Sequence, residues 1–150
     1  MKLNARMLKM ISILGLVVMI AALIGLYEIG GLFSAQPIAI ALQIIAVTLI
    51  VWARVTFGRR SFHAAANPTA GGLVTTGPYR YIRHPIYTAA CLLGWGSIIV
   101  HWSLASVVFG VLLLLGGLAR MVCEEQLLKK SYPEYLEYSK VTKRMIPYLF

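Results

Sequence analysis

Four long hydrophobic runs, separated by short polar segments, dominate the pattern of this chain. The runs cover residues 10–27, 37–53, 86–101 and 103–121. A membrane helix needs about 20 apolar residues to cross a hydrocarbon core of about 30 Å, so the pattern predicts about four transmembrane helices. His101 and Trp102 alone interrupt the last two runs, which are therefore expected to form a tight helical hairpin.

The composition agrees with a membrane protein. Of the 150 residues, 59% are hydrophobic and 13% are charged, and the mean hydropathy is +0.78. A soluble domain of this length cannot bury so much apolar surface. No small-residue cleavage site follows the first run, so we expect a retained helix and not a removed signal peptide. The predicted fold class is an all-α, multi-pass integral membrane protein.

Basic residues are distributed unevenly among the polar segments. Apart from Arg120, Lys and Arg lie before the first run, in the loop 54–85 and after the fourth run, while the connection 28–36 has none. The positive-inside rule therefore predicts that both termini and the 54–85 loop face the cytoplasm. The charge, 14 Lys and Arg against 5 Asp and Glu, is interrupted by apolar runs. It favours anionic membrane lipids over a nucleic-acid partner.

The tail after the fourth run predicts one further element. Leu127, Leu128 and Tyr135 recur at helical spacing, which indicates an amphipathic helix along the membrane surface. Together with the 54–85 loop, this helix flanks the predicted hairpin on the cytoplasmic side. We divide the chain into a two-helix membrane region, 1–57, and a region that carries the polar motifs, 58–150.

Residues 75–87, TTGPYRYIRHPIY, concentrate polar and aromatic side chains just before the third run. Pro85 disfavours a helical backbone at His84 and is itself suited to the first turn of a helix. Amides exposed at such a helix start favour an anionic group, for example a carboxylate or a phosphate. The alternative is a plain membrane-boundary motif with Tyr79, Tyr81 and Tyr87 as interfacial aromatics.

A second group of charges follows the fourth run. Arg120 and Glu124 are four residues apart and share a helix face, so together they suit a zwitterion, or an acidic acceptor beside a cationic cofactor. The alternative is a simple ion pair at a helix end. Glu125 points about 100° away, and we expect it to be a solvated partner of Lys129.

Other catalytic chemistries find few residues. The chain has no Ser/His/Asp set and no phosphate-binding glycine loop. It also has no aspartate and no HExxH or CxxC motif, so we expect no metal site. Cys91 and Cys123 are not at metal-ligand spacing. We expect both to be reduced, packed side chains.

Three elements occur in a telling order. They are LVTTGPYRYIRHPIYTA at 73–89, R-x-x-x-E-E at 120–125, and YPEYLEY followed by TKRMIP in the tail. In this order the chain resembles the isoprenylcysteine carboxyl methyltransferase family and its phospholipid methyltransferase relatives, over about 90 residues from 58 to 147. It departs from that family at Ser131-Tyr132-Pro133, where a Phe-Gly is usual, and at 61–70, which lacks the polar cofactor contact of eukaryotic members.

The resemblance implies an S-adenosylmethionine-dependent methyltransferase of a prokaryotic cell membrane, with a cytoplasmic cofactor pocket and a lipid-facing tunnel. It implies that Arg120 orients a lipophilic methyl acceptor, such as an isoprenylcysteine carboxylate. The positions that match the cofactor's surroundings in the family are Leu73, Val74, Tyr79, His84, Pro85, Ile86, Tyr87 and Glu124.

The acceptor and the function class stay open at this point. A carboxylate acceptor is already ionised at neutral pH, whereas an amine needs a base, for which Glu124, Glu125 and His84 are the candidates. One other class is a sterol-type membrane reductase that uses NADPH, since those enzymes carry a similar R-H-P-x-Y element. A second is a non-enzymatic membrane protein whose polar segment only anchors the helices.

Overall fold

The computed structural model describes residues 4–58 and 72–150. Helices make up the fold within these ranges, and a single isolated parallel bridge joins Ile82 to Lys143. The predicted all-α fold class is confirmed. The elements in chain order are α1 (Ala5–Glu28), α2 (Pro37–Phe57), the 3₁₀ helix η2 (Gly77–Arg80), α3 (Pro85–Val100), α4 (Leu104–Ser131) and α5 (Tyr135–Val141).

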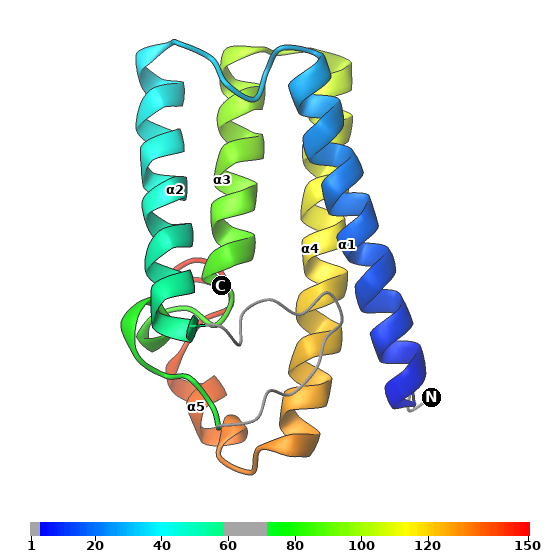
Figure 1. Cartoon of the computed structure of the whole chain (residues 1–150), viewed down its shortest axis with the longest axis vertical. Coiled ribbons are helices and arrows are strands. Elements are labelled where there is room, and N and C mark those ends of the chain that lie inside the picture. The colour runs from blue at the N-terminus through cyan, green and yellow to red at the C-terminus, as the bar shows by residue number, and fades with distance from the viewer. Residues whose placement is uncertain (1–3, 59–71) are drawn as a thin grey trace.

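Three helices are long and apolar enough to cross a membrane. They are α1, α2 and α4, with 24, 21 and 28 residues. The fourth, α3, is also apolar and runs alongside them (Figure 1), but it has 16 residues. That length corresponds to about 24 Å, against a hydrocarbon core of about 30 Å. The chain is thus an integral membrane protein in which one helix of the bundle is shorter than the others.

The predicted hairpin between the last two runs is confirmed. α3 ends at Val100 and α4 begins at Leu104. Ser103 caps α4, because its hydroxyl accepts a hydrogen bond from the Ser106 amide at 3.1 Å while the Ser106 hydroxyl accepts one from the Ser103 amide at 3.0 Å. The Ser106 hydroxyl also donates to the His101 carbonyl at 2.7 Å, which fixes the short turn from within.

The bundle consists of two closely packed helix pairs. α1 packs chiefly on α4, and α2 chiefly on α3 (Figure 1). In the first pair, a Cβ added at Gly116 would lie 2.8 Å from the carbonyl oxygen of Gly15. The buried residues of α2 are three alanines seven positions apart, Ala39, Ala46 and Ala53. Small residues at these contacts let the helix backbones approach closely, as is usual within membranes.

The segments that carry the basic residues gather at one end of the bundle. In Figure 1 the N-terminus, the end of α2, the start of α3 and α5 all lie at the lower end, and the connections 29–36 and 101–103 lie at the upper end. The structure therefore separates the basic segments from the 28–36 connection, as the charge distribution predicts. The segment 61–70, where a cofactor contact was expected to be missing, lies outside the described residues.

The tail forms two parts. α4 continues beyond residue 121 to Ser131, so Leu127 and Leu128 belong to it and not to a separate surface helix. α4 ends at Ser131, two residues before Pro133, which cannot donate a backbone hydrogen bond. α5 follows as a helix of 7 residues. Residues 143–145 then return to the start of α3. Both cysteines, Cys91 and Cys123, are free and buried, as expected.

Candidate functional site

His84 is placed by the local chemistry of the His-Pro pair. It is the N-cap of α3 with φ −127° and ψ 56°, and Pro85 is the first helical residue, as predicted. The His84 side chain is buried, and its amide donates to the carbonyl of Arg144 at 2.9 Å. The His84 amide is therefore already hydrogen-bonded to the tail. The predicted binding of an anion by the neighbouring amides at the helix start stays a prediction.

Arg120, Tyr87 and Glu124 form a closed ring of hydrogen bonds, which we call the Arg120 network. The expected ion pair is present, with Nη2 of Arg120 3.2 Å from Oε1 of Glu124. Arg120 Nε donates to the Tyr87 hydroxyl at 2.7 Å, and this hydroxyl donates to the same Glu124 oxygen. Arg120 is 4% exposed, whereas the Glu124 side chain is 23% exposed. The network is thus more than a simple ion pair at a helix end.

The first helix also contributes to the Arg120 network. Arg120 Nη1 donates to the backbone carbonyl of Ser12 at 2.9 Å. Close packing makes this contact possible, since a Cβ added at Gly15 would lie 3.0 Å from Cγ of Arg120. From the sequence, α1 had no predicted role beyond membrane insertion. The one available signal was the small residue at Gly15, which suits close helix packing.

The prediction for Glu125 is wrong. Glu125 is 3% exposed and does not lie free in solvent beside Lys129. Its Oε1 accepts from Nε of Arg83 and from Nε of Arg144, both at 3.1 Å, and its Oε2 accepts from Nη2 of Arg144 at 3.1 Å. His84 Nε2 is 3.3 Å from Oε1. The tail and the segment before α3 cover this face of α4, so the partners come from distant parts of the chain.

Arg83 and Arg144 connect this buried carboxylate to the tail. Arg83 Nη1 donates to the carbonyl of Ser139 at 3.0 Å and to the carbonyl of Thr142. The hydrogen bond with Glu125 raises the pKa of the Arg144 guanidinium, which therefore stays charged. Arg83 thus connects α5 and the residue that follows it to the start of α3, and the Arg144 guanidinium connects the tail to α4.

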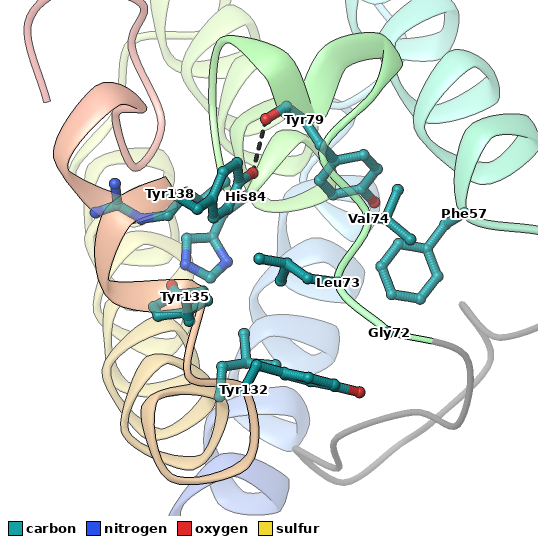
Figure 2. Close-up of a pocket in the computed structure, with 11 residues that line it drawn as sticks. Phe57, Gly72, Leu73, Val74, Tyr79, His84, Tyr132, Tyr135 and Tyr138 are labelled. Atoms are coloured by element: carbon teal, nitrogen blue, oxygen red, sulfur yellow. Dashed lines mark hydrogen bonds between the residues drawn. The ribbon is translucent and has the colours of Figure 1, made fainter.

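A pocket opens beside His84 (Figure 2). It encloses about 420 Å³ of empty space, counting the part that is open to solvent. Its basic lining residues, within the described ranges, are Arg83 and His84. The remaining walls are mainly aromatic or apolar: Phe57 from α2, Leu73, Val74 and Tyr79 from the segment before α3, Leu128 from α4, and Tyr132, Tyr135 and Tyr138 from the tail.

The structure sorts the predicted site residues into two neighbouring groups. Leu73, Val74, Tyr79 and His84 line the pocket. The remaining polar ones, Tyr87, Arg120 and Glu124, form the Arg120 network. His84 joins the groups, because it lines the pocket while its Nδ1 lies 3.7 Å from Oε2 of Glu124.

Two predicted residues fall outside both groups, and some lining residues were missed. Pro85 and Ile86 form the first turn of α3 and are not among the described pocket-lining residues. Phe57 and Leu128 carried no signal as pocket residues, because each belongs to an element that reaches the pocket only through the fold. Arg83 directly precedes the predicted His84 and was still not predicted to line the pocket.

Comparison with known proteins gives a family for this arrangement. Residues 32–135 match the family model of the phospholipid methyltransferases. The matched residues include α2, α3 and α4. The chain belongs to this family. In this phospholipid methyltransferase family member, α1 precedes the matched region, although its Ser12 carbonyl accepts a hydrogen bond from Arg120.

One curated relative is the nickel-cobalt-cadmium resistance protein NccN of Alcaligenes xylosoxydans xylosoxydans. The two chains are 33% identical over 79 residues, which are 51% of this chain and 37% of the relative. The match thus covers little more than a third of that protein. No solved structure matches this chain significantly.

In the part of the chain that the structure describes, no three His, Cys, Asp or Glu side chains are grouped to hold a metal ion.

Proposed function

We propose that this chain transfers a methyl group from S-adenosylmethionine to a lipophilic acceptor in the membrane, at a site that faces the cytoplasm. The observation that carries the proposal is the position of His84, between an aromatic-walled pocket and the buried Arg120 network. Membership of a methyltransferase family supports methyl transfer as the reaction. The region 58–150 would supply most of the site, with α1 supporting Arg120.

The side chains fit a cofactor that is partly aromatic and partly charged. The rings of the pocket suit a flat, uncharged group, and the partly exposed carboxylate of Glu124 suits an ammonium group. When bound, S-adenosylmethionine supplies the reaction with a methyl group on a positively charged sulfur. In this proposal the cofactor is surrounded by Leu73, Val74, Tyr79, His84, Pro85, Ile86, Tyr87 and Glu124.

The protein would act mainly by positioning and by excluding water. Arg120 and His84 are both nearly inaccessible to solvent, so both side chains are held in place and the charge of Arg120 is little screened. Arg120 would orient the acceptor, and an acceptor carboxylate would compete with Glu124 for its guanidinium. Such a carboxylate needs no base, since it is already ionised at neutral pH.

Calorimetric titration of the detergent-purified protein tests the proposal. We expect saturable binding of S-adenosylmethionine and S-adenosylhomocysteine, and none of NADPH as the control. Binding of NADPH alone would favour a reductase. Binding of none of the three would favour a membrane protein without enzymatic activity.

The acceptor class can be tested once binding is established. Methyl-labelled S-adenosylmethionine is incubated with the protein and a lipid extract, the extracted lipids are treated with alkali, and the volatile label is counted. A methyl ester releases its label as methanol in alkali, whereas an N-methyl group keeps it. Alkali-labile label would support a carboxylate acceptor, and stable label would replace it with an amine.

A further inference from the structure

Tyr135 carries a polar atom without a partner in the wall of the pocket. Its side chain is 1% exposed, and its hydroxyl forms no hydrogen bond within the described part of the chain. Figure 2 shows the ring beside His84, at the side of the pocket that the tail forms. Buried hydroxyls are nearly always hydrogen-bonded, and leaving one unsatisfied costs about 1 to 3 kcal/mol. This oxygen is therefore a candidate contact for a ligand.

The neighbouring Tyr138 lines the same pocket, and its hydroxyl has a hydrogen-bond partner. Its hydroxyl donates to the backbone carbonyl of Tyr79 at 2.7 Å, drawn as the dashed line in Figure 2. Burial raises the pKa of Tyr138 to about 12, and burial likewise raises the pKa of Tyr135. Both phenols are therefore neutral at pH 7 and can donate. Tyr138 uses its hydroxyl to hold the fold, whereas Tyr135 keeps its own free.

The rest of the lining indicates which part of a ligand this hydroxyl meets. Phe57, Tyr79 and Tyr132 supply flat aromatic surface. The basic residues among the described lining residues are Arg83 and His84, and no carboxylate is among those lining residues. Such a wall does not favour an ammonium group. It favours an uncharged ring system with polar edge atoms, since bases bind aromatic side chains by stacking.

We propose that the Tyr135 hydroxyl hydrogen-bonds the nucleoside part of the ligand, whose base lies among the aromatic rings of the pocket. This inference rests on the proposed use of S-adenosylmethionine. The amino-acid part of the ligand would then lie beyond His84, toward Glu124. Tyr135 thereby supplies a hydrogen bond from the tail to the nucleoside.

The test compares Tyr135→Phe with Tyr138→Phe as a matched control. Both changes remove one oxygen from a pocket tyrosine of α5. Calorimetry measures the affinity for S-adenosylhomocysteine and for 5′-methylthioadenosine, which keeps the nucleoside and lacks the amino-acid end, and thermal unfolding measures stability. We expect Tyr135→Phe to weaken both ligands about 2- to 10-fold without lowering the melting temperature. Tyr138→Phe should lower the melting temperature and weaken the ligands less.

Several outcomes would overturn the inference. Equal affinity of Tyr135→Phe and the unchanged protein for both ligands would remove the contact. Weaker binding of S-adenosylhomocysteine alone would move the hydroxyl to the amino-acid end. A large loss of stability in Tyr135→Phe would show that the hydroxyl serves the fold. In all three cases the proposed function survives, whereas it fails together with the inference if the unchanged protein binds neither ligand.

Discussion

The guanidinium of Arg120 on α4 hydrogen-bonds the backbone carbonyl of Ser12 on α1, with 2.9 Å between Nη1 and the oxygen. A backbone acceptor of this kind fixes the position of the arginine without neutralising its charge. α1 precedes the region matched to the phospholipid methyltransferase family, 32–135. The first helix therefore supports the Arg120 network in addition to being long and apolar enough to cross a membrane.

Close packing of α1 and α4 leads to a prediction on two adjacent glycines. A Cβ at Gly116 would lie 2.8 Å from the Gly15 carbonyl oxygen, whereas a Cβ at Gly117 meets nothing closer than Sδ of Met19 at 3.9 Å. Gly116→Ala should therefore destabilise the protein by about 1 to 3 kcal/mol. Gly117→Ala should be neutral or stabilising, since alanine favours a helix over glycine by about 1 kcal/mol. Thermal unfolding in detergent measures both, and equal melting temperatures would contradict the packing.

The buried carboxylate of Glu125 leads to a second prediction. Glu125→Gln keeps the shape of the side chain but leaves Arg83 and Arg144 without a counter-charge, which should cost about 3 to 5 kcal/mol. The control is Glu137→Gln, which removes an exposed ion pair with Lys140 and should cost less than about 1 kcal/mol. Thermal unfolding gives the difference. Limited proteolysis should also release the tail of Glu125→Gln first, and the prediction fails if both variants behave alike.

The third prediction concerns cofactor affinity. Glu124→Gln removes the charge that we assign to the ammonium group, so binding of S-adenosylhomocysteine should weaken by about 1.5 to 3 kcal/mol. His84→Ala should also weaken it, because His84 lines the pocket. Calorimetry measures both, with Glu137→Gln as the control. Unchanged affinity in both variants would remove His84 and Glu124 from the cofactor site.

Arg120 should behave differently from these two residues. In Arg120→Lys the charge remains but the planar set of donors is lost, so the contacts with Ser12 and Tyr87 cannot both be kept. We expect a higher KM for the lipophilic acceptor and an affinity for S-adenosylhomocysteine within about 3-fold of the unchanged protein, roughly 0.6 kcal/mol. Labelled methyl transfer and calorimetry provide the two readouts. Strongly reduced cofactor affinity would place Arg120 in the cofactor site instead.

The proposed cytoplasmic orientation can be tested with two introduced cysteines. Lys140→Cys lies in α5, which is at the end of the bundle that carries the basic segments (Figure 1). Phe33→Cys lies in the connection 29–36, which is at the other end, and Phe33 is 69% exposed. Cys91 and Cys123 are buried and should contribute little background. In intact cells, a membrane-impermeant maleimide should label Phe33→Cys and not Lys140→Cys. The reverse labelling would invert the topology.

Local sequence was sufficient for features that depend on neighbouring residues. Apolar runs predicted the helices, His84-Pro85 predicted the start of α3, and the spacing of Arg120 and Glu124 predicted their ion pair, which the structure contains. Each of these follows from periodicity, proline geometry or the helical turn. None requires knowledge of how distant segments meet.

The features that were missed depend on contacts between distant segments. Glu125 binds Arg83 and Arg144, which are 42 and 19 residues away, and its own helix gives no sign of them. The bond from Arg120 to α1 uses a backbone carbonyl, and every residue has one, so the sequence cannot mark it. The pocket likewise combines α2, α4 and the tail, which only the packed bundle brings together.

The short backbone pairing between the tail and the start of α3 also sets an order of events in the cell. The carbonyls of Lys143 and Arg144 hold the amides of Arg83 and His84, at 2.7 and 2.9 Å. A ribosome makes residues 143 and 144 after all the helices of the bundle. The helices can therefore enter the membrane during translation while His84 still lacks its backbone partner, which reaches it only when residues 143–145 fold back onto α3.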